Sequence, residues 1–312
     1  MKKILKNNSN FSSASKSSLP VLDPWYTTGL FDGEGSLGVS ISKNLNRSLG
    51  YVITLTCEIA LHNKDLHILK ALSAHFGVGG IYSHTGDMMR YKVSSIRDLT
   101  RVIIPHFENY PLQSQKRADF DLFKSVIKII NKGPISLDDL QEIVNLKASL
   151  NRGLSSVLQA SFPNTVPVAR PLVKFTEIPD PNWLSGFTDA EGCFYVSVYD
   201  SPKSKLGEAV QLAYIVTQHI RDRELVEGLV NYLGCGKYSM RKEGGDFKVL
   251  SITDINEKIV PFFSEYQLQG IKALKFSDFR AVAEIMKMKG HLTKEGLEKI
   301  KTIKARMNKG RF

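Results

Sequence analysis

The sequence contains few cysteines, no long apolar run and fewer acidic than basic residues. Its three cysteines, Cys57, Cys193 and Cys235, lie far apart and form no Cys-x-x-Cys pair. This argues against a disulfide framework or a structural zinc site and favours a reducing compartment. No apolar stretch approaches the roughly 20 residues that span a bilayer, so we expect a soluble chain with no membrane partner.

The charge balance points to a polyanionic partner. The 312 residues include 42 Lys and Arg against 31 Asp and Glu, which gives a net charge of +11. Such an excess favours nucleic acid first and an acidic membrane surface second, and a basic soluble enzyme without such a partner is the alternative. With 42% hydrophobic residues, the chain is long enough for two ordinary domains.

The first 19 residues contain four lysines and many Ser and Asn, but neither an acid nor an arginine. We interpret residues 1–22 as a disordered basic arm that can touch phosphates. An organelle transit peptide is the alternative, which the absence of arginine disfavours.

The second half of the sequence repeats the first. GLFDGEG (29–35) returns as GFTDAEG (186–192), 157 positions later. A period this long excludes a solenoid and indicates two copies of one domain, related by pseudo-twofold symmetry like a fused homodimer. The same or a nearly equal shift relates LHNKD (61–65) to QHIRD (218–222), FGVG (76–79) to LGCG (233–236), and PHFENYPLQSQK (105–116) to PFFSEYQLQGIK (261–272).

The two copies are separated by a proline-rich segment. Five prolines lie in residues 162–183. Because proline stops helices and stiffens the chain, we predict an interdomain linker over residues 161–182. The N-terminal domain then covers residues 23–160, and the C-terminal domain covers residues 183–312.

Each copy shows the same order of secondary-structure signals. The repeated motif ends a short helix, and the next stretch alternates, with Leu37, Val39 and Ile41 on one face and serines on the other. A second strand, a helix beginning near Asp65 or Asp222, another strand pair and long helices follow. We therefore predict an α+β fold of two pseudo-symmetric αββαββα repeats, each with an antiparallel sheet.

The motif itself can be interpreted in two ways. Asp-Gly and Glu-Gly pairs are common in surface turns. The repetition, however, preserves small residues four apart, Gly29 with Gly33 and Gly186 with Ala190, which is about one helical turn. Glycine inside a helix costs about 1 kcal/mol relative to alanine, so a helix that keeps it usually needs a close neighbour. We predict that the two motif helices pack against each other.

Glu34 and Glu191 would then be the last residues of these helices, before Gly35 and Gly192, which suit a helix-terminating C′ position. Carboxylates at a helix C-terminus oppose its dipole. Two of them held together are unfavourable unless a cation lies between them, and carboxylates with backbone carbonyls are ligands that Mg²⁺ chooses. Such a pair of sites suits in-line cleavage of a phosphodiester.

The two motifs resemble the signature of the LAGLIDADG homing endonucleases, in their single-chain, two-motif, group I intron-encoded form. The resemblance runs essentially from Trp25 to the C-terminus. It implies that the motif helices form the central interface and that each copy lays a curved antiparallel sheet into the DNA major groove. It also implies a monomeric, site-specific double-strand DNA endonuclease that hydrolyses a long pseudo-palindromic site. The implied cofactor is Mg²⁺, with Mn²⁺ as a substitute and Ca²⁺ bound without supporting cleavage.

Carried over residue by residue, the resemblance places the family's metal-binding acid on Glu34 and Glu191. The carbonyl of the preceding residue falls on Gly33 and Ala190. We assign a structural role to the motif's earlier acid, which falls on Asp32 and Asp189.

The resemblance also implies a catalytic supporting group. The family's basic residue maps to Lys116 and Lys272, for which a solvated helix lysine is the alternative. Gln218 corresponds to a polar residue that positions water, but its counterpart in the first copy is Leu61. This difference predicts unequal active sites.

The polar sides of the predicted strands can be either a solvated sheet face or a DNA-contacting surface. In a basic chain with a predicted nuclease centre we favour DNA contact, because Arg and Lys on strands can reach phosphates or guanine edges. The predicted contact residues are Ser36, Gly38, Ser40, Ser42, Asn44, Tyr82, His84, Arg90 and Lys92 in the first copy, and Cys193, Tyr195, Ser197, Tyr199, Lys237, Ser239, Arg241 and Lys248 in the second.

Two alternatives to an endonuclease remain. The family includes maturases, which bind their own intron RNA and assist splicing without cleaving DNA. A degenerate DNA-binding regulator is less favoured because both acids are present.

His62 and His219 precede helix starts and are predicted to cap or pack, and Cys235 is predicted to be a small buried turn residue. The family context suggests a reading frame in a fungal mitochondrial intron, and hence a mitochondrial protein.

Overall fold

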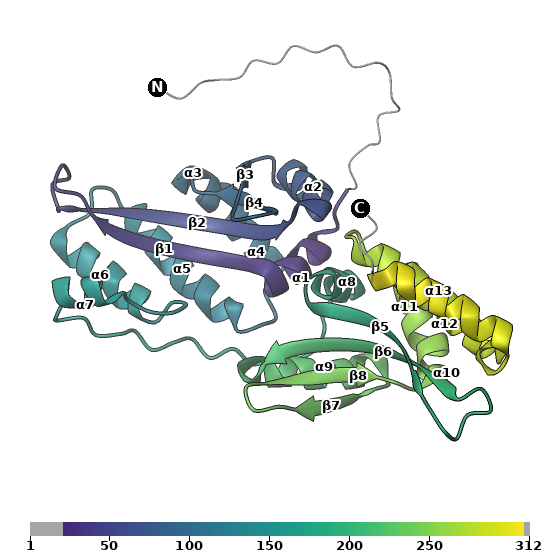
Figure 1. Cartoon of the computed structure of the whole chain (residues 1–312). Helices are drawn as coiled ribbons and strands as arrows, with labels where there is room; N and C mark the ends of the chain where they lie inside the picture. The colour runs from purple at the N-terminus through teal and green to yellow at the C-terminus, as the bar shows by residue number, and fades with distance from the viewer. Residues whose placement is uncertain (1–20, 309–312) are drawn as a thin grey trace, which may run out of the picture.

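The computed structural model describes residues 21–308, and its two halves have the same order of elements (Figure 1). Most of the predicted basic arm, residues 1–20, lies outside the described residues. The first half contains α1 (Pro24–Glu34), β1 (Gly35–Lys43), β2 (Tyr51–His62), η1 (Asn63–Asp65), α2 (Leu66–Phe76), β3 (Gly80–Ser83), β4 (Met88–Val93), α3 (Ile96–Asp98), η2 (Leu99–Ile103), α4 (Ile104–Asn109), α5 (Lys116–Ile130), α6 (Leu137–Ala148) and α7 (Ser156–Ser161). The second contains α8 (Pro181–Glu191), β5 (Gly192–Asp200), β6 (Glu208–His219), η3 (Ile220–Asp222), α9 (Arg223–Leu233), β7 (Lys237–Met240), β8 (Gly244–Val249), α10 (Ile252–Asp254), η4 (Ile255–Ile259), α11 (Val260–Glu265), α12 (Lys272–Lys287), η5 (Gly290–Leu292) and α13 (Lys294–Asn308).

Each half builds one antiparallel four-stranded sheet. The strand orders are β1-β2-β4-β3 and β5-β6-β8-β7, so the two sheets have the same topology. In β1 the predicted alternation is confirmed: Leu37, Val39 and Ile41 are buried, whereas Ser36 and Ser40 are exposed. One face of each sheet therefore packs on helices and the other is free for contact. The prediction of an α+β fold with two pseudo-symmetric repeats is confirmed.

Each half has its own hydrophobic core on the helical side of its sheet. Leu55 of β2, Tyr91 of β4 and Phe123 of α5 belong to the first core. Tyr214 of β6 and Phe279 of α12 belong to the second. Figure 1 shows the two sheets on either side of the paired helices α1 and α8. The chain is thus two domains joined through those helices.

The motif helices begin with the same local signals. Asp23 and Asp180 are the N-cap residues, and their carboxylates accept hydrogen bonds from Trp25 N and Asn182 N, each at 2.7 Å. A proline occupies the first helical position of both helices, where its missing N–H costs nothing. Pro181, the last of the five prolines, therefore starts α8.

The packing of α1 on α8 requires glycine. A Cβ atom at Gly29 would lie 2.8 Å from the carbonyl carbon of Trp183 and closer still to its oxygen. The pseudo-symmetric Gly186 has the same relation to Tyr26, with 2.8 Å to the carbonyl carbon. The prediction that small residues let these two helices touch is confirmed.

The expected C′ role of Gly35 and Gly192 is wrong. Both have extended rather than left-handed backbone, with φ of −75° and −76°. The helix passes directly into a strand, so no left-handed cap is formed. These glycines are needed for space instead: a Cβ would overlap the Phe31 ring at Gly35 and the Thr188 side chain at Gly192.

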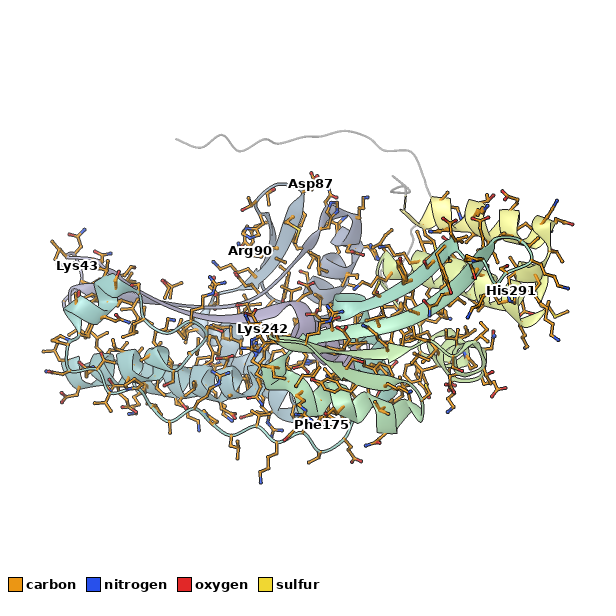
Figure 2. All side chains as sticks on the ribbon, turned by 60° about the horizontal axis from the view of Figure 1, so that its bottom comes forward. Lys43, Asp87, Arg90, Phe175, Lys242 and His291 are labelled. Carbon is orange, nitrogen blue, oxygen red and sulfur yellow. The ribbon has the colours of Figure 1, made fainter. Side chains whose placement is uncertain are left out.

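The segment between the halves has no regular structure from residue 164 to 180, and most of its side chains are exposed, but it contacts both halves at a few points. Arg170 donates two hydrogen bonds to Asp119 of α5, at 2.8 and 3.0 Å. The ring of Phe175, which is labelled in Figure 2, lies against Gly228 of α9, and Ile178 is buried in the second core. Within residues 21–308, no helix combines the length and apolar character that crossing a membrane requires.

Candidate functional site

The C-terminal ends of α1 and α8 bring two carboxylates together. Glu34 and Glu191 are the last residues of these helices. A Cβ atom at Gly33 would lie 3.1 Å from Cγ of Glu191 and would overlap Ala190, so the helix ends are in contact here. Burial raises the pKa of the Glu34 carboxyl, and the negative charge of Glu191 raises it further. Sequence reasoning therefore placed these two acids correctly beside each other.

Both predicted lysines reach this centre. Lys116 donates through Nζ to the carbonyls of Phe31, at 3.2 Å, and of Gly33. Lys272 donates to the carbonyls of Thr188, at 3.2 Å, and of Ala190, at 2.6 Å. The amines therefore bind the last turn of each motif helix, and the alternative of solvated helix lysines is excluded.

The placement of these lysines is electrostatically unfavourable on its own. Each is the first residue of its helix, α5 or α12, where the helix dipole repels a cation. Burial lowers the pKa of both Lys116 and Lys272, while the nearby carboxylates of Glu34 and Glu191 oppose this shift. Two lysines kept at such positions beside two acids indicate a functional centre.

The earlier acids of the motifs hold the turns that precede the lysines. Asp32 accepts hydrogen bonds from Gln113 N at 2.9 Å and Ser114 N at 3.0 Å, and from the Trp183 indole at 2.8 Å. Asp189 occupies the equivalent place in the second half, where it accepts from Gln269 N at 2.7 Å and Gly270 N at 3.1 Å, and from the Tyr26 hydroxyl of the first half at 2.7 Å. Burial raises the pKa of both carboxyls, against the hydrogen bonds that lower it. Both acids have a structural role.

The donor atoms at the helix ends suit a hard divalent cation. The carboxylates of Glu34 and Glu191 and the carbonyls of Gly33 and Ala190 are all oxygen ligands, the type that Mg²⁺ prefers. Among the described residues, no three His, Cys, Asp or Glu side chains gather closely enough to hold an ion by themselves. An ion here would share its coordination with backbone carbonyls, water or a substrate phosphate.

Gln218 lies beside one of the two acids. It shares the core-facing side of β6 with Tyr214 and Val216, and at the end of the strand it lines an open cavity of about 580 Å³ together with Glu191. Its counterpart Leu61 is buried in the first hydrophobic core. The two halves of the centre therefore differ chemically at this position.

The predicted contact residues of the first sheet lie on its free face. Ser36, Ser40, Ser42, Tyr82 and His84 are exposed, and the other predicted contact residues of this half, Gly38, Asn44, Arg90 and Lys92, are half-buried. In register, β2–β4 pairs Glu58 with Lys92 and Ala60 with Arg90, and β3 pairs Tyr82 with Arg90. Asn44 lies in the turn after β1, where its Oδ1 accepts from Asn46 N at 3.1 Å. Figure 2 shows Lys43 and Arg90 on this half of the molecule.

The second sheet presents the corresponding set. Its exposed members are Cys193, Tyr195, Tyr199, Lys237 and Ser239, whereas Ser197 and Lys248 are half-buried. Arg241 is exposed in the turn between β7 and β8, beside Lys242, which is labelled in Figure 2. The structure thus gathers every predicted strand residue of a half on one face, and their role in DNA contact stays a prediction.

Several of these cations are paired with acids that sequence reasoning missed. Arg90 Nη1 lies 3.2 Å from Glu58 of β2, and Arg90 Nη2 lies 3.0 Å from His84 Nε2. Asp246 of β8, with 0% exposure, pairs with Lys248 at 2.8 Å and with Arg241. The alternation of β2 carried a signal for Glu58, because it shares the free face with Thr54 and Thr56.

A model of the family described as "LAGLIDADG endonuclease" matches residues 27–127 and 184–283. The chain belongs to this family. Two Neurospora crassa proteins are similar: "Probable intron-encoded endonuclease 3" is 40% identical over 293 residues, covering 91% of this chain and 54% of that protein. "Probable intron-encoded endonuclease 2" is 34% identical over 299 residues, covering 91% of this chain and 64% of that protein. The LAGLIDADG chain therefore spans between about half and two thirds of the length of these relatives.

Solved LAGLIDADG structures have the same fold over nearly the whole chain. I-LtrWI, a homing endonuclease bound to target DNA, is 44% identical with a TM-score of 0.90, covering 93% of this chain and 98% of that one. I-SmaMI, bound to an uncleaved DNA target in the presence of calcium ions, is 38% identical with a TM-score of 0.90, covering 93% and 100%. The resemblance to the single-chain, two-motif members of the family is confirmed.

The other residues singled out in the sequence, two histidines and one cysteine, have structural roles. His62 and His219 are N-cap residues whose Nδ1 atoms accept from Lys64 N and Arg221 N, each at 3.2 Å. Cys235 is buried, as expected of a small turn residue. The prediction that these histidines cap helix starts is confirmed.

Proposed function

We propose that this LAGLIDADG chain is a site-specific double-strand DNA endonuclease that hydrolyses phosphodiester bonds at a long pseudo-palindromic site. The observation that carries the proposal is the meeting of Glu34 and Glu191 at the ends of the packed motif helices, each end bound by a lysine. This centre lies between two sheet faces with exposed polar and basic side chains. The DNA-bound structures of similar chains support the same partner.

In this proposal Glu34 and Glu191 hold divalent metal ions, together with the carbonyls of Gly33 and Ala190. Mg²⁺ is the natural ion, Mn²⁺ can replace it, and Ca²⁺ binds without supporting cleavage. When bound, the metal supplies Lewis-acid chemistry, making water a better nucleophile and neutralising charge on the leaving oxygen. Burial and the negative charge of Glu191 raise the pKa of Glu34, and such a cation would offset this charge repulsion.

The side chains around the carboxylates do the remaining work. Lys116 and Lys272 hold positive charge beside the position where a phosphate gains negative charge, which stabilises the transition state electrostatically. Gln218 can orient a water molecule next to Glu191, whereas Leu61 cannot do so in the first half. We infer that the two strands are cut by unequal sites.

The sheet faces position the duplex. Arg and Lys side chains on the free faces contact phosphates and base edges, and the serines and tyrosines add neutral hydrogen bonds. Both halves of the centre are on one chain, so we propose that the protein acts as a monomer. The intron-encoded relatives from a fungus support a reading frame in a fungal mitochondrial intron and a mitochondrial location.

The test is cleavage of a plasmid library that contains the intronless junction of the host gene, with Mg²⁺. The parent should make double-strand cuts, and Glu34→Gln or Glu191→Gln should slow at least one strand by about a hundredfold or more. Glu295→Gln is a matched control: it removes a carboxylate from α13, outside the motif helices, and the variant should cleave DNA like the parent.

Stability separates lost chemistry from lost folding. Replacing Glu34 removes a like-charge repulsion, so Glu34→Gln should unfold at the same or a higher temperature than the parent. Absence of cutting by the parent on every library member, together with tight binding to the host intron RNA, would overturn the proposal in favour of a maturase.

A further inference from the structure

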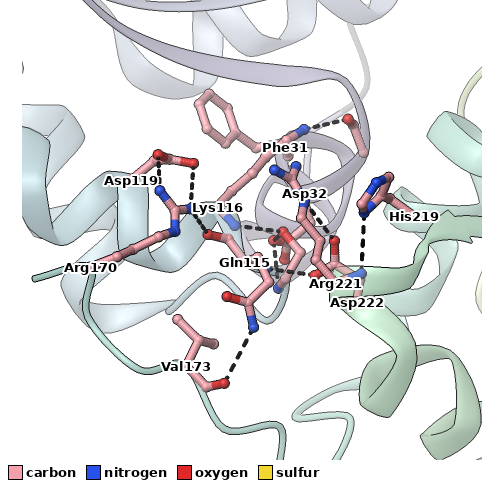
Figure 3. A network of polar contacts seen from close by, with 12 residues as sticks. Phe31, Asp32, Gln115, Lys116, Asp119, Arg170, Val173, His219, Arg221 and Asp222 are labelled. Atoms are coloured by element: carbon pink, nitrogen blue, oxygen red, sulfur yellow. Dashed lines mark hydrogen bonds and ion pairs between the residues drawn. The ribbon is translucent and has the colours of Figure 1, made fainter. Parts of the chain in front are cut away.

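Each active-site lysine follows a residue whose backbone N–H is bound by the opposite half of the molecule. Asp222 of η3 accepts a hydrogen bond from Gln115 N at 2.7 Å, and Lys116 is the next residue. Asp65 of η1 accepts from Ile271 N at 2.7 Å, and Lys272 is the next residue. Asp65 and Asp222 are equivalent positions of the sequence repeat, so the exchange is reciprocal. Figure 3 shows the Asp222 contact beside Lys116.

These bonds satisfy a backbone N–H group at the start of α5 and of α12, where the N-cap side chain makes no capping hydrogen bond. Gln115 and Ile271 are the N-cap residues of α5 and α12, and neither offers a side-chain cap. The first N–H groups of a helix need acceptors, and a carboxylate there also favours the helix dipole. The carboxylate from the opposite half thus fills the capping role at the helix end that begins with the lysine.

Each turn is held by two carboxylates from different halves. In the first turn Asp32 binds the N–H groups of Gln113 and Ser114, and Asp222 binds the next one, of Gln115. In the second turn Asp189 binds the N–H groups of Gln269 and Gly270, and Asp65 binds that of Ile271. In each turn, three successive backbone N–H groups are therefore bound by two aspartates: the first two by the aspartate of the same half, and the third by the aspartate of the other half.

The surroundings make these contacts strong without making them the sole support of the turn. Asp222 is 4% exposed, and Arg221 Nε lies 3.3 Å from its carboxylate. The linker also braces the first turn, because Arg170 donates to Gln115 O at 2.9 Å (Figure 3). In the second turn His67 Nε2 lies 2.7 Å from Gln269 O. Loss of one aspartate should loosen the turn rather than unfold the domain.

We propose that Asp222 positions Lys116 and Asp65 positions Lys272, so that the opposite half aligns each lysine and the centre is complete only when the halves are docked. The catalytic part of this inference rests on the endonuclease activity proposed above. Asp65 and Asp222 touch neither the lysine amines nor the acids Glu34 and Glu191. They act through the backbone that carries the lysines, as positioning residues.

The first experiment resolves the two strands in single-turnover cleavage. Asp222→Ala should reproduce the strand preference of Lys116→Met, with the affected strand slowed about tenfold to a hundredfold, because small misplacements of a reacting group cost that much. Asp65→Ala should reproduce the pattern of Lys272→Met. Asp222→Asn should restore most of the rate, because an amide oxygen still accepts from Gln115 N.

A matched control removes a capping carboxylate that lies within one half. Asp139 caps α6 by accepting from Ser136 N at 3.0 Å, and Asp139→Ala should slow neither strand selectively. The positioning role would be overturned if Asp222→Ala and Asp65→Ala each slowed both strands equally and Asp222→Asn cleaved no faster than Asp222→Ala.

A second readout is independent of cleavage. In protein labelled with ¹³C at lysine Cε, the Lys116 resonance should shift in Asp222→Ala and stay unchanged in Asp65→Ala, with the converse for Lys272. A parent that cuts no DNA would overturn the proposed function, while these spectra still decide the positioning. Unmoved Lys116 and Lys272 resonances in both variants would overturn the inference.

Discussion

Gly29 of α1 lies directly against the backbone carbonyl of Trp183 in α8, with no space for a Cβ atom between them. Gly186 repeats this relation against the carbonyl of Tyr26. The two helices therefore approach each other at backbone distance, and their last residues, Glu34 and Glu191, must end side by side.

Gly29→Ala should destabilise the protein by about 3 kcal/mol, because overpacking a tight contact forces the helices apart. Thermal and urea unfolding measure the change. Gly86→Ala is the control: its glycine has a φ of +61° and nothing within 4 Å of an added Cβ, so only about 1–2 kcal/mol of backbone strain is expected. A Gly29→Ala protein as stable as the parent would contradict the close packing.

Two single substitutions, Gln218→Leu and Leu61→Gln, should affect activity and stability differently. On the proposed function, Gln218→Leu should slow cleavage of one strand while leaving the unfolding temperature nearly unchanged, since the residue lines an open cavity. Leu61→Gln should cost about 1–3 kcal/mol, because it buries an amide in the first hydrophobic core. Strand-resolved cleavage and thermal unfolding of both variants provide the check. Equal slowing of both strands by Gln218→Leu would argue against unequal sites.

The stability of the first half should fall in mild acid because of His106. Burial, with a smaller effect of His75, lowers the pKa of His106 to about 3. An unfolded histidine titrates near pH 6.5, so below that pH the unfolded chain binds a proton that the folded one refuses. Stability therefore rises with pH in this window and drops by up to about 1.4 kcal/mol for each pH unit below 6.5.

Urea unfolding at pH 7.5 and pH 5.0 measures this dependence. His106→Gln should be less stable at pH 7.5, since it disturbs the contact of His106 Nε2 with Thr28 Oγ1 at 3.2 Å, but its acid decline should be shallower by about 2 kcal/mol. The same decline in His106→Gln as in the parent would show that other groups cause it.

Loss of Glu58 should make binding to random-sequence DNA tighter and more salt-dependent. The carboxylate of Glu58 pairs with Arg90 on the free face of the first sheet, at 3.2 Å. Glu58→Gln releases Arg90 for a phosphate, so the slope of log affinity against log salt should steepen by about 1.

The measurement is fluorescence anisotropy over a series of salt concentrations. Glu295→Gln changes the net charge equally but releases Lys299 on α13, 2.8 Å from Glu295, and should not alter the slope. Equal effects of the two variants would mean that net charge, rather than the sheet face, governs DNA binding.

Much of the candidate site was predictable because its signals are local or repeated. The alternation of β1 identified Ser36 and Ser40 as free-face residues, since strand faces alternate with a period of two. The small residues four apart predicted the helix contact. The cap of Gly35 was wrong because a glycine after a helix equally serves a helix that runs straight into a strand.

The sequence by itself determined the two-domain repeat, the family and the pair of acids, because each is written in short segments that recur with the same spacing. Only the tertiary structure decided how the lysines are held. The bonds from Asp222 to Gln115 and from Asp65 to Ile271 join residues 107 and 206 positions apart. An Asp after a strand looks like an ordinary helix start in sequence. It becomes the cap of the opposite half only because α1 and α8 dock the two domains face to face.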